Sequence, residues 1–242
     1  MAKLETMVSA PVEETFGWTG FYIGVQAGVA FNPDDDGVLT FDTDLDGSYG
    51  DRIGAFGDNF EGNFDESASF GVHVGYDYQI DRFVLGFLLD INKLDISQEQ
   101  SGFSSTPAFY TEQRELDFLA TGRLRAGYLI TDRFLAYVTG GIAYGDVDYN
   151  YLTDTPATVR SRGGSSGSDD LGYAVGAGLE ARITQSISMT VEYLYTDLGE
   201  GDFVTNLSGP AAFSGRAAST DSRGSDRDFD FHTVQVKLSY RF

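Results

Sequence analysis

The sequence contains no cysteine, which excludes a disulfide framework and a thiolate metal site. No apolar run approaches the ~18 residues that a membrane-spanning helix needs; the longest run, 83–89, ends at Asp90. Basic residues are also scarce, with 16 Lys and Arg against 37 Asp and Glu. The resulting net charge of −21 argues against a nucleic-acid partner, whose phosphates would be repelled.

Glycine and aromatic residues are abundant instead. The chain of 242 residues holds 30 glycines, and 14% of its residues are aromatic. A hydrophobic content of 41% is enough to bury a core, which disfavours disorder. These proportions favour a glycine- and aromatic-rich β protein.

Apolar and small or polar residues alternate with a period of two, the pattern of a strand with one apolar face. In the first run, Phe21, Ile23 and Val25 share one face, and Tyr22 and Gly24 occupy the other. Eight such runs occur, at about 21–31, 69–78, 83–92, 115–128, 134–144, 171–183, 187–195 and 233–242.

Connections between the runs alternate in length. Tight turns fall at 79–82, 130–133 and 184–186, and long polar loops at about 32–67, 97–113, 148–170 and 198–228. This arrangement predicts an all-β, antiparallel up-and-down barrel of eight strands with both termini on the short-turn side. We assign residues 18–242 to the barrel and residues 1–17 to a flexible N-terminal segment.

The large apolar residues should face outward. An eight-stranded barrel is barely wide enough inside for side chains, so it accommodates glycine and a few long polar residues rather than rows of Phe, Tyr and Leu. Eight apolar strips exposed to water would exceed the apolar patches that soluble monomers tolerate. The pattern therefore predicts a transmembrane barrel, with aromatic rings such as Tyr22, Phe83, Tyr128 and Phe134 near the membrane boundaries.

Three segments carry a family resemblance: WTGFYIGVQAGVAF at 18–31, GLEARITQSISMTVEYLYTDLG at 178–199 and VQVKLSYRF at 234–242. They resemble the small eight-stranded outer-membrane proteins of alphaproteobacteria, also described as opacity-protein-like or porin-like. The resemblance implies an integral outer-membrane location, with extracellular loops, periplasmic turns and termini, and a monomeric state. It also implies contact with outer-membrane lipid and lipopolysaccharide. The outer-membrane assembly machinery is expected to recognise the last strand, which ends in Phe242.

Charged residues occupy the predicted inner face. Charges in a narrow barrel persist only when they are paired and hydrogen-bonded. We therefore predict a lumen network that fills the barrel; a gated ion path is the alternative. Its members are Asp90, Arg123, Arg125, Glu180, Arg182, Glu192, Lys237 and Arg241, and Asp117 is placed on the same face.

The sequence has two histidines, His73 and His232. No nucleophile motif accompanies either, which disfavours an enzyme. An axial haem ligand is the alternative reading of a lone histidine.

The first long loop is strongly acidic. Within it, Asp42, Asp44 and Asp46 match the opening of an EF-hand calcium loop. The match fails at its twelfth position, where Ile53 stands in place of a bidentate glutamate. A solvated acidic loop and a weak calcium site both remain open.

Together these features predict an envelope-structural or surface-interaction barrel with a lumen plugged by charged side chains. A narrow ion channel or a haemin-binding protein is the alternative. We expect no catalytic residues, and no cofactor apart from weakly bound calcium.

Overall fold

A computed structural model describes residues 16–33, 37–105, 108–155, 159–163, 171–201, 203–214 and 217–242. The described chain is almost entirely β, with one three-residue 3₁₀ helix, η2 (Ala211–Phe213). None of its helices is long and apolar enough to cross a membrane.

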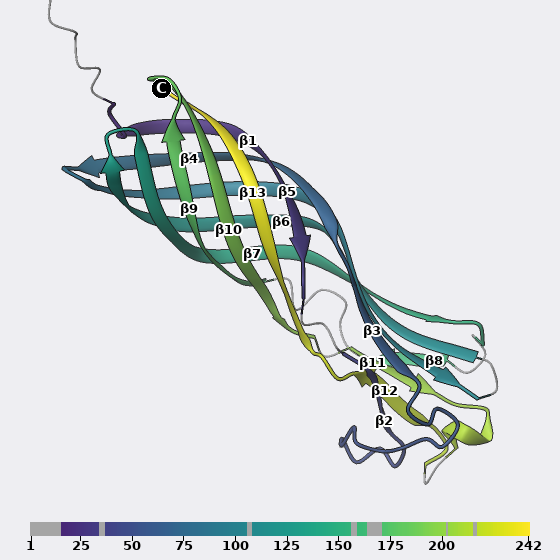
Figure 1. Cartoon of the computed structure of the whole chain (residues 1–242). Helices are drawn as coiled ribbons and strands as arrows, with labels where there is room; N and C mark the ends of the chain where they lie inside the picture. The colour runs from purple at the N-terminus through teal and green to yellow at the C-terminus, as the bar shows by residue number, and fades with distance from the viewer. Residues whose placement is uncertain are drawn as a thin grey trace, which may run out of the picture.

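Eight long antiparallel strands form a closed ring in the described chain (Figure 1). Their order around the ring is β5-β4-β1-β13-β10-β9-β7-β6, and pairing between β5 and β6 closes it. The predicted eight-stranded up-and-down barrel is confirmed. The strands are β1 (Gly20–Phe31), β4 (Ser67–Ile80), β5 (Phe83–Ser104), β6 (Ala108–Thr131), β7 (Phe134–Thr153), β9 (Leu171–Arg182), β10 (Ile187–Glu200) and β13 (Asp228–Arg241).

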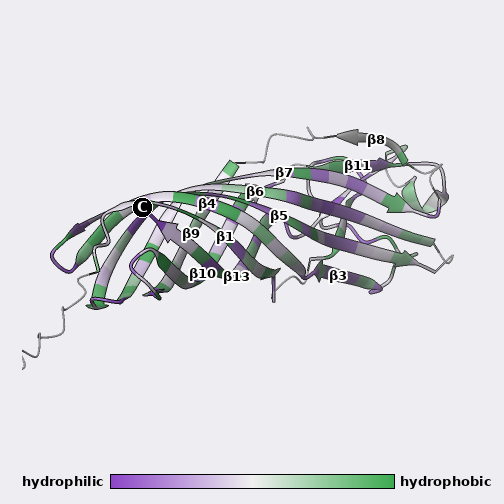
Figure 2. Ribbon diagram, turned by 90° about the horizontal axis from the view of Figure 1, so that it is seen from above, coloured by the Kyte–Doolittle hydropathy of each residue, from purple (hydrophilic) through white to green (hydrophobic). Residues whose placement is uncertain are grey.

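Outer and inner faces follow the predicted alternation. On β13, Val234, Val236 and Leu238 are 43–52% exposed, whereas Gln235 and Lys237 between them are 2–3% exposed. Figure 2 shows hydrophobic positions concentrated on the barrel strands near the C-terminus, and hydrophilic ones on the far parts of β5 and β6. We call the end with the short turns the turn end and the opposite end the loop end.

The predicted loop at 97–113 is wrong, because β5 runs to Ser104 and β6 begins at Ala108. In this part of β5 and β6 the strands extend beyond the region where outward residues are apolar. The outward residues here are polar, so the sequence resembles that of a loop. An additional strand, β3 (Phe60–Asp65), pairs with this part of β5.

Short strands from the remaining long connections form a second sheet at the loop end, in the order β2-β12-β11-β8. A cluster that includes Phe41, Phe56, Tyr110, Leu207 and Phe213 joins this sheet to the barrel wall. The loop end is therefore a folded structure with its own core. The four strands are β2 (Leu39–Asp42), β8 (Val159–Gly163), β11 (Val204–Leu207) and β12 (Thr220–Gly224).

Residues before β1 close the turn end. Trp18 is fully buried and packs with Val84, Leu129, Leu135 and Tyr137. Phe16, from the segment that the sequence analysis assigned to a flexible lead-in, is also buried and lies 4.6 Å from the Arg133 guanidinium. Residues 1–15 of that segment lie outside the described chain.

Candidate functional site

Arg123 lies at the centre of one ion-pair cluster in the lumen. Its two terminal nitrogens lie 2.6 Å from Asp90 Oδ2 and 3.0 Å from Glu192 Oε1. Lys237 Nζ lies 2.8 Å from the same Glu192 oxygen. The four side chains are at most 3% exposed, so the cluster is closed to water.

Neutral groups complete the hydrogen bonding of these carboxylates. Glu192 accepts hydrogen bonds from the Tyr137 hydroxyl at 2.5 Å and the Gln235 amide at 2.7 Å. Asp90 accepts from the Thr121 hydroxyl at 2.7 Å and the Asn92 amide at 2.9 Å. Such bonds offset part of the desolvation cost of a buried carboxylate.

A second cluster lies nearer the turn end. Arg125 contacts Glu180 at 2.5 Å and Asp77 at 3.7 Å, and Arg241 contacts Asp77 at 2.7 Å. The Tyr22 ring lies within 5.8 Å of the Arg125 guanidinium and 4.7 Å of that of Arg241. Gly75 stands opposite this ring, where an added Cβ would lie 2.3 Å from the Tyr22 hydroxyl.

Seven of the eight residues assigned to the lumen network belong to these two clusters. The eighth, Arg182, instead donates hydrogen bonds to the backbone carbonyls of Gly17, at 3.0 Å, and Gln185. Sequence reasoning omitted Asp77 from the network, although its position in the alternation already placed it on the inner face. It also placed Tyr22 at a membrane boundary, and that prediction is wrong.

Asp117 was predicted to face inward, and this is wrong because it is exposed. The register between β6 and β7 shifts between Leu116 and Leu119. A shift of one residue exchanges the two faces of a strand, so Leu116 points into the barrel, where it is fully buried.

Both histidines make side-chain contacts. The His73 ring nitrogens lie 2.9 Å from Gln26 Oε1 and 2.8 Å from the Ser239 hydroxyl, inside the barrel. His232 Nδ1 lies 2.6 Å from the Tyr193 hydroxyl, and the two rings stack. An axial bond to a haem iron from His73 would require the loss of one of its two hydrogen bonds.

An apolar layer occupies the lumen on the loop-end side of the two clusters, and the sequence analysis did not predict it. Its members face inward from all the barrel strands except β4. They are Ala30, Leu94, Ile96, Leu116, Leu119, Ala143, Val147, Ala174, Leu194, Leu198, Phe229 and Phe231.

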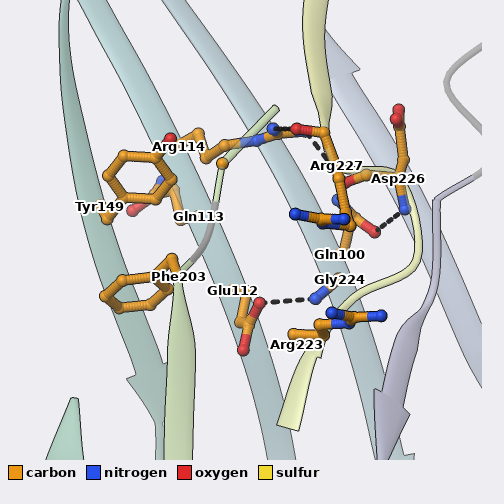
Figure 3. A pocket seen from close by; sticks show the side chains of 11 residues that line it. Gln100, Glu112, Gln113, Arg114, Tyr149, Phe203, Arg223, Gly224, Asp226 and Arg227 are labelled. Carbon is orange, nitrogen blue, oxygen red and sulfur yellow. Dashed lines mark hydrogen bonds between the residues drawn. The ribbon is translucent and has the colours of Figure 1, made fainter. Parts of the chain in front are cut away.

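A small polar pocket of about 30 Å³ lies beyond this layer (Figure 3). On one side the Tyr149 and Phe203 rings stack with centroids 5.2 Å apart. On the other, Arg114 donates hydrogen bonds of 2.7–3.1 Å to the carbonyls of residues 226–228. Gln100 donates to the Asp226 carbonyl at 2.7 Å and accepts from the Asp226 N–H at 3.1 Å. The segment between β12 and β13 is thereby fastened inside the loop end.

Glu112 holds the same segment from β6. Its carboxylate accepts a hydrogen bond of 2.7 Å from the Gly224 N–H. Burial raises the pKa of Glu112 from 4.5 to about 8, although Gly224, Arg114, Ser222 and Arg223 act in the opposite direction. Glu112 lies outside the outward apolar band, which ends near the exposed Asp117.

This pKa predicts a pH dependence of loop-end stability. Between pH 4.5 and about 8 the folded state binds more protons at Glu112 than the unfolded state, so stability falls as pH rises through this window. We expect Glu112→Gln to flatten that fall. The pH dependence is measured by thermal unfolding of the wild type and Glu112→Gln at several pH values in this window. Glu61→Gln, at an exposed position, is the control. If stability falls equally with pH in the wild type and in Glu112→Gln, the pH dependence does not come from Glu112.

The acidic loop brings a different trio together from the one expected. Carboxylate oxygens of Asp42, Asp44 and Asp51 lie within 4.8 Å of one another, and Asp46 is not part of the group. Asp51 joins because its N–H bonds to the Phe41 carbonyl at 3.1 Å, which returns residue 51 to the side of β2. Asp42 accepts backbone hydrogen bonds from Asp46 and Gly47. Calcium binding stays a prediction.

The closed ring, its outward apolar band and its filled interior define a membrane β-barrel. A family model described as the outer membrane protein beta-barrel domain matches residues 4–242. The chain belongs to this family, which confirms the resemblance inferred from the strand sequences and places the protein among outer-membrane proteins.

Curated relatives agree with that family. The 31 kDa outer-membrane immunogenic protein of Brucella melitensis biotype 1 is 31% identical over 236 residues, covering 97% of this chain and 87% of the relative. The 22 kDa outer membrane protein of Rhizobium leguminosarum bv. viciae is 26% identical over 233 residues, covering 96% and 82%.

A solved structure supports the same fold. The outer membrane protein OprG from Pseudomonas aeruginosa aligns with a TM-score of 0.60 and 18% identity, covering 95% of this chain and 99% of that one. At this identity the likeness concerns the fold alone.

Proposed function

We propose that this protein is a closed, monomeric outer-membrane barrel with a structural or surface-interaction role rather than a channel or an enzyme. In this proposal the loop end is extracellular, and the turn end and termini are periplasmic. The observation that carries it is the burial of the lumen charges: the side chains of Arg123, Asp90 and Glu192 are 0% exposed.

Two barriers in series support a closed lumen. A continuous file of water would leave the side chains beside it accessible, yet the charged clusters are almost fully buried. Beyond them, Ile96, Leu116 and Phe231 in the apolar layer are also fully buried. An ion crossing that layer would lose hydration without gaining polar partners, which is costly.

The loop end supports the surface role. It carries a second sheet and a hydrophobic core of its own beyond the outward apolar band. Such a structure adds nothing to membrane anchoring, whereas it presents a fixed surface for contact. Contact with lipopolysaccharide, and recognition of β13 by the assembly machinery, belong to the same proposal.

Planar-bilayer recording tests the closed lumen. We expect no large, steady conductance from the wild-type protein. Arg123→Ala alone should leave the lumen closed, because the apolar layer remains as the second barrier. Arg123→Ala combined with Phe231→Ala should produce small cation-selective currents, because Asp90 and Glu192 would lose a shared partner beside an opened layer. Arg52→Ala is the matched control, since Arg52 is 89% exposed at the loop end. Large conductance from the wild type would favour the channel instead.

A further inference from the structure

Five aromatic rings are in contact on the outward face of four adjacent strands, β1, β13, β10 and β9 (Figure 1). The His232 ring is central, with its centre 5.7 Å from that of Phe31 and 5.3 Å from that of Tyr195. The Tyr193 ring stacks on His232 at 5.7 Å, and the Tyr173 ring lies 6.1 Å from Tyr195. We call these five residues the ring cluster.

The ring cluster is accessible from outside the barrel. Tyr173 and Tyr193 are 47% and 45% exposed, and the other three rings are half-buried. The cluster lies at the loop-end edge of the outward apolar band: toward the turn end, the next outward residue on β13 is the exposed Val234, and toward the loop end it is Asp230. At such an edge aromatic rings meet the lipid headgroups.

Two carboxylates stand directly beside the ring cluster. Asp197 of β10 and Asp230 of β13 lie opposite each other in the strand register, one outward position beyond the pair formed by Tyr195 and His232. Like charges placed directly opposite on antiparallel strands destabilise a sheet. We call these two residues the acid pair.

The acid pair has no basic partner within the described chain. No described Lys or Arg forms an ion pair with either carboxylate, and Arg227, the base closest to Asp230 in sequence, contacts Glu200 at 2.8 Å. Neutral groups bond to both carboxylates instead: Asp197 accepts from the Gly199 N–H at 2.7 Å, and Asp230 accepts from the Asn32 amide at 3.4 Å. These donors position the acids and leave their charges uncompensated.

Rings and acids together are complementary to an ammonium group. The faces of aromatic rings attract cations, and ammonium ligands are recognised in this way. Carboxylates accept hydrogen bonds from an ammonium N–H and supply the opposite charge. The Tyr195 side chain is hydrogen-bonded to Asp230 and interacts electrostatically with Asp197, so the ring cluster and the acid pair form one site.

We propose that this site binds the ammonium headgroup of a membrane lipid. The inference rests on the proposed contact with outer-membrane lipid and names its site and the chemical group that is recognised. A lipid fits better than a soluble amine, because the ring cluster continues toward the turn end into Val191 and Val234, which are 51% and 43% exposed. An acyl chain would pack on these residues while its headgroup lies against the rings.

The experiment uses the full chain in nonionic detergent micelles with added phosphatidylethanolamine or phosphatidylglycerol of identical acyl chains. Native mass spectrometry counts the lipids retained. We expect about fivefold greater retention of phosphatidylethanolamine, as a cation held against aromatic faces implies, because phosphatidylglycerol carries a phosphate and no ammonium. Equal retention would overturn the proposal. Retention of both lipids only with added magnesium would assign the acid pair to a divalent cation and would also overturn it.

A matched pair of double variants tests the acids. Asp197→Asn with Asp230→Asn should abolish the preference for phosphatidylethanolamine. Glu115 and Asp148 likewise stand opposite each other, on β6 and β7, but do not adjoin the ring cluster. Glu115→Gln with Asp148→Asn removes the same charge and should leave the preference unchanged. Equal loss in the two double variants would assign the preference to diffuse charge and overturn the site.

Two substitutions at Tyr195 test the rings. Tyr195→Leu keeps an apolar side chain and removes the central aromatic face, so it should lower the preference strongly. Tyr195→Phe keeps the face and should retain most of the preference. Mobility on gels before and after boiling establishes that each variant is a folded barrel. A Tyr195→Leu protein with the wild-type preference would show that the rings take no part.

The outcome is separable from that of the conductance test. Equal retention of the two lipids by a barrel that is closed in planar bilayers overturns this inference alone. A conducting wild-type barrel overturns the closed lumen, and the lipid preference is then judged by its own variants.

Discussion

Replacing Glu192 with alanine is expected to lower the free energy of unfolding by about 3–5 kcal/mol, the range found when one partner of a buried ion pair is removed. Glu192 is fully buried and contacts Arg123 at 3.0 Å and Lys237 at 2.8 Å. It also accepts hydrogen bonds from Tyr137 and Gln235. Alanine would leave two cations sharing Asp90 and two neutral donors without their acceptor.

Urea unfolding in detergent, followed by the mobility difference between folded and unfolded barrel on gels, measures this loss. Glu192→Gln separates charge from shape, because the amide oxygen still accepts hydrogen bonds while the ion pairs are lost. Its stability should lie between those of wild type and Glu192→Ala. Glu61→Ala, on an exposed position of β3, is the control. A Glu192→Ala protein as stable as this control would contradict the proposed network.

The barrel and much of its lumen are predictable from the sequence because lipid and a narrow interior impose opposite demands on alternate residues. Arg123 and Glu192 lie far apart in the chain, yet their position in the alternation places both inside. Their pairing also follows from the cost of an isolated buried charge. Alternation alone does not give the partners, because those depend on which strands are adjacent and how far each is shifted along its neighbour.

Bulges limit this reasoning. The shift between Leu116 and Leu119 exchanges inward and outward positions, and no glycine or proline marks it in the sequence. Strict alternation through the predicted run at 115–128 therefore places Leu116 outside and Asp117 inside. The observed faces have a physical reason, because this part of β6 lies beyond the outward apolar band. Asp117 is exposed there, and Leu116 packs in the apolar layer of the lumen.

The same reversal of polarity explains why the segment 97–113 was predicted to be a loop although most of it belongs to β5 and β6. Outward residues of β5 and β6 beyond the band, such as Glu99 and Gln113, bond to each other at 3.0 Å. Their inward neighbours Ile96 and Leu116 belong to the apolar layer. Here the outward residues are polar and the inward residues of the apolar layer are hydrophobic, the opposite of the membrane part; beyond the layer, polar residues such as Gln100 and Glu112 also face inward. The expectation that outward residues are apolar holds only in lipid, so applying it here predicts a loop instead of a strand.

Trp18→Ala is expected to destabilise the turn end by about 3–5 kcal/mol, as large aromatic truncations in cores do. Trp18 is fully buried, its indole N–H donates to the Asp132 carbonyl at 3.1 Å, and its backbone N–H donates to Gln79 at 3.0 Å. Arg241 donates to the Trp18 carbonyl at 2.6 Å.

The ring also supports the arginines that close this end. The guanidinium groups of Arg182 and Arg241 lie 5.3 and 5.6 Å from its centre, so its removal would leave a cavity beside two cations. Trp18→Phe retains most of the packing and loses the indole donor, and we expect it to recover more than half of the lost stability. Because Trp18 is the sole tryptophan, its fluorescence reports wild-type unfolding directly, and circular dichroism compares the variants. A Trp18→Ala barrel that unfolds at the wild-type urea concentration would show that the Trp18 side chain contributes no stability to the barrel.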